Sequence, residues 1–136
     1  MKFLPAILIS ILMLGSLLGS SCSDTNVLQP GDDIEFPDSN VSFFYHVQPF
    51  LRLKCSYQGC HSEEHRAGGI RLTDYFSLFE TPLLIVLTDP PDPDNSWLVQ
   101  IIERRAGHNP YLPDNYITQN EIDGIRQWIL EGARNN

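Results

Sequence analysis

Three stretches of the chain repeat apolar residues at intervals of three and four positions, which is the pattern of amphipathic helices. They run from Ser42 to about Leu53, from a capping residue within 94–96 to about Arg105, and from Thr118 to Gly132. Pro49 lies inside the first stretch and predicts a kink or a restart. No stretch alternates apolar and polar residues over strand length, so the pattern predicts an all-α fold.

The third predicted helix has the clearest end signals. It opens with Thr118-Gln-Asn-Glu121, which fits a capping box, and it closes at Gly132. Trp128 lies at the edge of its apolar stripe, and both Trp128 and Trp97 are expected in the core.

The connecting segments are less regular. Thr73 or Asp74 can cap a short helix through Phe79, whereas the apolar run 83–87 is too short to assign by periodicity. The proline-rich segment 88–96 that follows cannot be helical through its prolines.

The N-terminus has the pattern of an export signal: Lys2, an almost entirely apolar run over 3–18, small residues at 19–21 and then Cys22. A transmembrane anchor is the alternative, but the run is short of the roughly 20 residues that span a bilayer. The small residues and Cys22 resemble the lipobox of bacterial lipoproteins, which implies a lipid on Cys22. An ordinary free or disulfide-bonded cysteine is the alternative for Cys22.

The chain therefore divides into a signal peptide (1–21), a lipidated flexible tether (22–40) and one small domain (41–136), and its 136 residues suit one domain. The tether is expected because residues 23–40 are polar and lack apolar periodicity. The net charge of −8 argues against nucleic acid as a partner, because phosphates require clustered Lys and Arg.

The segment Cys55-Ser-Tyr-Gln-Gly-Cys60-His61 carries the candidate chemistry. In c-type haem attachment two thiols form thioethers with the haem vinyl groups, and the histidine directly after the second cysteine binds the iron. The spacer here is longer than in the usual Cys-x-x-Cys-His motif, so the chain must bulge between the cysteines. Gly59 suits such a bulge because glycine tolerates positive φ.

Two other uses of these residues stay open. A disulfide between Cys55 and Cys60 is chemically available in an exported protein. A zinc ion could take Cys55, Cys60 and either His61 or His65, although a closed structural site needs a fourth ligand.

The order of elements resembles the class I cytochrome c domain, in which the first and last helices cross beside the haem. It is most similar to the single-haem cytochrome domains of exported bacterial lipoproteins, which use a long Cys-x4-Cys-His motif. The matching segments are VQPFLRLKCSYQGCH, GGIRLTDY, DPDNSWLVQII and ITQNEIDGIRQWILEGARNN. The resemblance covers 41–136 and implies three to four helices around one haem c, with Cys55 and Cys60 attached and His61 as proximal ligand.

That family normally supplies a methionine as sixth iron ligand, in a Met-Pro pair before the last helix. This chain has Leu112-Pro113 there, and its two methionines lie in the predicted signal. His108 in the same loop is the best replacement. His65 follows the haem motif closely, and His46 lies on the entry helix. The remaining possibility is an open or water-bound iron, with Leu112 packed on the porphyrin.

The resemblance implies an electron carrier and not an enzyme. It would act with a redox partner protein at the cell envelope, on the periplasmic face or the outer membrane. An open distal site would instead bind a small gas or reduce peroxide, and a zinc- or disulfide-stabilised binding lipoprotein is the third interpretation. Five cations are candidates for the haem propionates, although solvated charge is expected for most of them: Arg52, Lys54, Arg71, Arg104 and Arg105.

Overall fold

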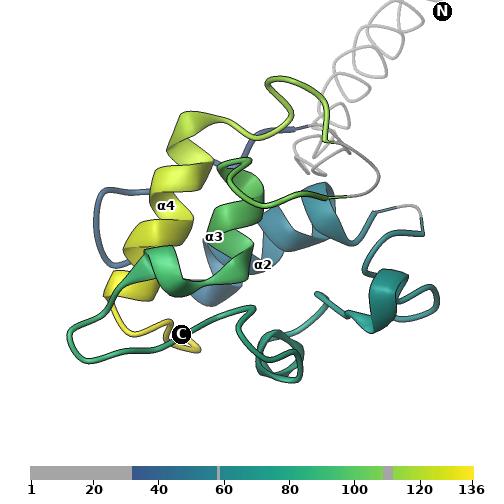
Figure 1. The fold of residues 1–136 in the computed structure, drawn as a ribbon. Helices are drawn as coiled ribbons and strands as arrows, with labels where there is room; N and C mark the ends of the chain where they lie inside the picture. Colours follow the sequence, from purple (N-terminus) through teal and green to yellow (C-terminus); the bar gives the residue numbers. More distant parts are fainter. Residues whose placement is uncertain (1–31, 58, 109–111) are drawn as a thin grey trace, which may run out of the picture.

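The computed structural model describes residues 32–57, 59–108 and 112–136 (Figure 1). These residues form helices, turns and irregular segments but no strands, so the prediction of an all-α fold is confirmed for this part of the chain. The predicted signal peptide and Cys22 lie outside the described residues. None of the described helices is long and apolar enough to cross a membrane.

The first predicted helix forms as three consecutive segments: η1 (Phe43–Val47), α2 (Gln48–Phe50) and η2 (Leu51–Cys55). The Ser42 side chain caps it by accepting a hydrogen bond from the backbone N–H of Tyr45. The expected start is therefore confirmed.

The chain stays helical through Pro49, which lies in the first turn of α2. The segments on either side have wider π-type turns, in which N–H groups bond carbonyls five residues back, as from Gln48 to Phe43 and from Ser56 to Leu51. A proline ring clashes with the carbonyl four residues before it, and a wider turn moves that carbonyl away.

The other two predicted helices are α3 (Trp97–Ile102) and α4 (Gln119–Leu130). Helix α4 has both hydrogen bonds of the predicted capping box, and Gly132 follows it with φ of 89°. Helix α3 is shorter than predicted, because the chain turns at Arg104 with a φ of 61°. The spacing of apolar residues does not predict this left-handed turn. The turn is accompanied by contacts of the Arg104 side chain with the Pro113 carbonyl and Asp114, across the following loop.

Short 3₁₀ turns connect the helices: η3 (Ala67–Gly69), η4 (Phe76–Phe79) and η5 (Pro93–Asn95). The run 83–87 is irregular, and the carbonyls of Leu83 and Leu84 accept the first N–H groups of α3. This run therefore satisfies donors that a helix start leaves unpaired.

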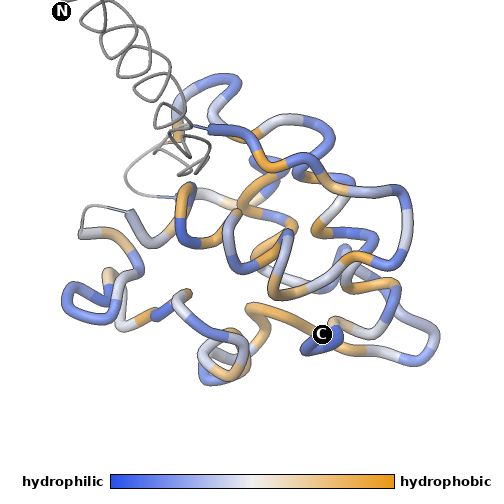
Figure 2. Tube along the Cα trace, turned by 180° about the vertical axis from the view of Figure 1, so that it is seen from behind, coloured by the Kyte–Doolittle hydropathy of each residue, from blue (hydrophilic) through white to orange (hydrophobic). Residues whose placement is uncertain are grey.

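The core lies between the first helical segments, α3 and α4, which Figure 1 shows side by side. Apolar stretches of the chain gather in this interior, and hydrophilic stretches lie mostly in the outer loops (Figure 2). Trp128 is fully buried, as expected, and its Nε1 donates to the Arg134 carbonyl. Trp97 is 46% exposed, so its predicted core role is wrong, because it occupies the first position of α3 and points outward.

The predicted flexible tether is wrong for its last residues. Ile34 and Phe36 are buried against α4, where their N–H groups donate to the side chains of Glu121 and Asn120. Ile34 and Phe36 are isolated apolar residues in a segment of mostly polar composition. Because they follow neither a helical nor a strand period, the sequence did not predict that they pack on the domain. The packed domain therefore begins near Ile34 and not at Val41.

Candidate cofactor site

An apolar cavity of about 240 Å³, partly open to solvent, lies beside the cysteine motif. This volume is close to the lower end of the roughly 300–1,000 Å³ typical of small-molecule sites. Its walls come from the loop after the motif, the run 83–87, α3 and the loop before α4. The apolar side chains that line it are Ile70, Leu72, Leu84, Leu98, Ile101, Ile102, Leu112, Pro113 and Ile117.

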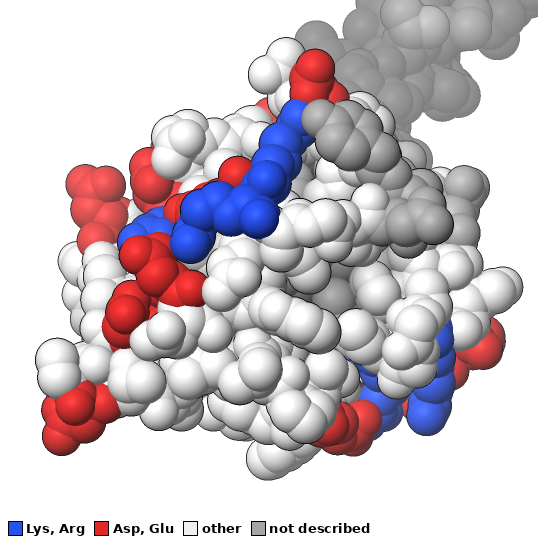
Figure 3. Space-filling view, in the orientation of Figure 1, with Lys and Arg blue, Asp and Glu red and all other residues white. Residues whose placement is uncertain are grey.

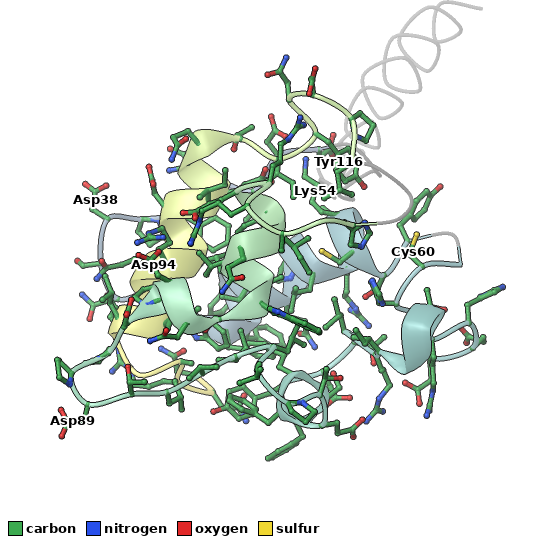
Figure 4. All side chains as sticks on the ribbon, in the orientation of Figure 1. Asp38, Lys54, Cys60, Asp89, Asp94 and Tyr116 are labelled. Atoms are coloured by element: carbon green, nitrogen blue, oxygen red, sulfur yellow. The ribbon has the colours of Figure 1, made fainter. Side chains whose placement is uncertain are left out.

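Six side chains with nitrogen, oxygen or sulfur atoms also line this cavity: Lys54, Cys55, Cys60, His61, His108 and Tyr116. Lys54, Tyr116 and Cys60 lie on the same side of the molecule in Figure 4, and Asp38 and Asp94 lie on the opposite side. The structure thus brings Cys55, Cys60 and His61 of the predicted motif to one cavity. Nothing in the sequence spacing points to Tyr116, because its approach depends on how the loop before α4 folds back.

The two cysteines are free thiols in this structure. Cys55 ends η2, and the chain returns through Gly59 at a φ of 87°, the conformation expected for the bulge. The His61 N–H donates to the Cys55 carbonyl over 3.0 Å and closes this loop. Burial, with Cys60 close by, raises the pKa of the Cys55 thiol to about 12.

The His61 ring has a defined orientation. Its Nδ1 lies 3.3 Å from the Ile70 carbonyl oxygen, and a carbonyl can only accept, so Nδ1 carries the hydrogen. Nε2 then keeps its lone pair. Burial lowers the pKa of His61, opposed by the hydrogen bond to Ile70, while the neighbouring His108 lowers it further. A neutral imidazole whose second nitrogen is held by a carbonyl is the usual state of a metal-binding histidine.

The other histidines differ in their relation to the cavity. The His108 ring faces the same cavity as His61, with ring centroids 5.9 Å apart. His65 is exposed and packs beside Gly59. The His46 Nδ1 accepts a hydrogen bond from the Ser42 N–H on the first helix. Neither His65 nor His46 belongs to the cavity lining.

Lys54 differs from the other basic residues because it is buried beside the cavity. Its Nζ lies 2.8 Å from Asp33 and 3.5 Å from the buried Glu121, and 5.3 Å from the Tyr116 ring centroid. Burial alone would lower the pKa of Lys54, but the hydrogen bond to Asp33 and the Glu121 charge hold it above its usual value. Lys54 is therefore a protonated, paired cation.

Other basic side chains pair with carboxylates at the surface. Arg71 binds Glu63 and Glu80, and Arg105 binds Asp94. On the face shown in Figure 3, Lys and Arg form two groups that lie beside Asp and Glu, with a broad uncharged area between them.

Among the residues that the structure describes, no three His, Cys, Asp or Glu side chains gather as a group that could hold a metal ion. The chain matches no protein-family model, no curated protein and no solved structure. The cavity itself is therefore the basis of the functional argument.

Proposed function

We propose that this protein is an exported, membrane-tethered c-type cytochrome that carries one covalent haem and transfers single electrons at the cell envelope. The observation that carries the proposal is the meeting of two free thiols and an oriented imidazole at one apolar cavity. Cys55, Cys60 and His61 line this cavity together, and the carbonyl of Ile70 orients His61.

These residues fit a haem in their chemistry. Each thiol S–H adds across one vinyl C=C, which forms a thioether and leaves no other product. The Nε2 lone pair of His61 suits iron, and the apolar walls suit a porphyrin face, whose burial contributes about 25 cal/mol per Å². The positive φ of Gly59 suits the bulge that the long spacer between the cysteines requires.

When bound, the haem would supply one-electron redox chemistry between a donor and an acceptor redox protein. The chain supplies ligation, burial and orientation. Export and the lipid on Cys22 are part of the proposal on the strength of the N-terminal sequence. They would keep the domain beside membrane-bound redox partners.

Haem attachment is tested by expressing the full chain in cells that carry the c-type haem maturation machinery. Covalent haem is measured by the pyridine haemochrome spectrum and by haem staining after denaturing electrophoresis. We expect one haem per chain, found with the membrane fraction, and none in the double variant Cys55→Ala/Cys60→Ala.

The matched control is Tyr57→Phe, an exposed position between the two cysteines. This variant should attach haem as the parent protein does. A parent protein that folds but carries no haem under these conditions would show that the proposal is wrong.

A further inference from the structure

Few side chains around the cavity carry an atom that could bind iron together with His61. In the loop before α4, Leu112 and Pro113 line the cavity, and their apolar side chains have no atom that can bind iron. Lys54 is a protonated cation paired with carboxylates. The Tyr116 hydroxyl donates to the Lys54 carbonyl over 3.1 Å, and burial raises the pKa of this phenol, so it stays protonated. Of the described lining residues, His108 alone adds a second imidazole.

The distance between the two rings matches that role. Two imidazoles that bind one metal from opposite sides, each through a nitrogen about 2.0–2.1 Å away, have centroids about 6 Å apart. The rings of His61 and His108 have centroids 5.9 Å apart, with planes inclined by 66°. Apolar binding cavities are lined by only a small number of polar groups. In this cavity those groups include two imidazoles at the separation expected for two histidines that bind the same metal ion.

The chain segment that carries His108 is anchored at both ends. It begins at the left-handed Arg104, whose Nη2 donates to the Pro113 carbonyl over 2.6 Å. The same guanidinium pairs with Asp114. These contacts join Arg104, which precedes His108 in the chain, to Pro113 and Asp114, which follow it.

We propose that the imidazole of His108, together with that of His61, would hold the iron of the bound haem. The inference rests on the proposed haem function. It would give the iron two protein ligands without any methionine, and it favours a carrier over a site with an open position for gas or peroxide. A second imidazole in place of methionine also lowers the reduction potential.

The test compares the haem-loaded full chain with His108→Ala, His108→Met and His65→Ala, using optical and electron paramagnetic resonance spectra. We expect a low-spin ferric parent and a low-spin His65→Ala control. In His108→Ala the low-spin signal should be lost while the haem content stays the same, and added imidazole should restore it. In His108→Met the reduction potential should rise.

The outcomes separate the two proposals. A haem-loaded parent with high-spin iron, or a His108→Ala variant that stays low-spin, would overturn the role of His108 and leave haem attachment standing. A parent and variants that all lack covalent haem would overturn the proposed function, and the ligand assignment with it.

Discussion

At the scale of single residues, Gly124 shows how one missing side chain permits a long-range contact. It lies in the middle of α4, where glycine is a poor helix former. A Cβ at this position would overlap the ring and the Cβ of Phe36, which lies over the helix. Phe36 is only 4% exposed, so its side chain has little space into which it could move away from an added Cβ. The glycine therefore lets the N-terminal segment pack on α4.

Gly124→Ala is expected to lower the free energy of unfolding by about 1–3 kcal/mol, the usual cost of overpacking a core. Helix propensity alone would instead raise it by about 1 kcal/mol. Chemical denaturation of the purified protein measures the sign. Gly107→Ala is the control, since a Cβ there meets nothing within 4 Å. Equal or greater stability of Gly124→Ala would contradict the packing described for Phe36.

At the scale of elements, the end of α4 holds the chain that leads into the first helix. Glu131 is the C-cap residue of α4. Its two carboxylate oxygens accept hydrogen bonds from the N–H groups of Asn40 and Val41 over 2.7 and 2.9 Å. Gln127 and Arg134 also donate to this carboxylate. Burial raises the pKa of Glu131, but these donors outweigh it and hold the pKa below its ordinary value of 4.5.

Because this pKa is depressed on folding, the contribution of Glu131 to stability is complete above pH 4.5 and is lost as the pH falls through the lower folded-state pKa. Glu131→Gln should therefore lower the free energy of unfolding at pH 7, by about 1 kcal/mol, and flatten its dependence on pH below about 4.5. Denaturation curves at several pH values measure both effects. Asp123→Asn, on the exposed side of α4, should change neither. If the pH dependence of the free energy of unfolding is unchanged in Glu131→Gln, the stabilising role of the contacts between Glu131 and the N–H groups of Asn40 and Val41 is contradicted.

At the scale of the whole molecule, the cavity interrupts an otherwise continuous core. Four of its wall residues are themselves members of the core cluster: Leu72, Leu84, Leu98 and Ile102. A ligand that fills the cavity would join the loop after the motif to α3 and to the loop before α4. The proposed haem would thus also be a structural element of a small domain, a size class in which the apolar core alone gives only marginal stability.

Protein expressed without haem maturation is expected to be less stable than the haem-loaded form, because the cavity walls lose their apolar contact. The denaturation midpoint of the haem-free form should be clearly lower, and it should bind a fluorescent apolar dye that the loaded form excludes. Equal midpoints for the two forms would argue that the haem does not occupy this cavity.

The sequence by itself determined the features whose causes are local. Capping at Ser42 and at Thr118–Glu121, the buried stripe of α4 and the glycine turn at Gly59 each depend on residues within a few positions of one another. The cysteine–histidine motif is local in the same sense.

Only the tertiary structure decided the features that join distant parts of the chain. The packing of Ile34 and Phe36 on α4, the early end of α3 at Arg104 and the meeting of His61 with His108 all depend on partners far along the chain. Composition and the periodicity of apolar residues do not predict such contacts. Two side chains that are distant in the sequence come into contact only when the backbone between them folds. The sequence could therefore name His108 as a candidate, whereas its approach to His61 required the fold.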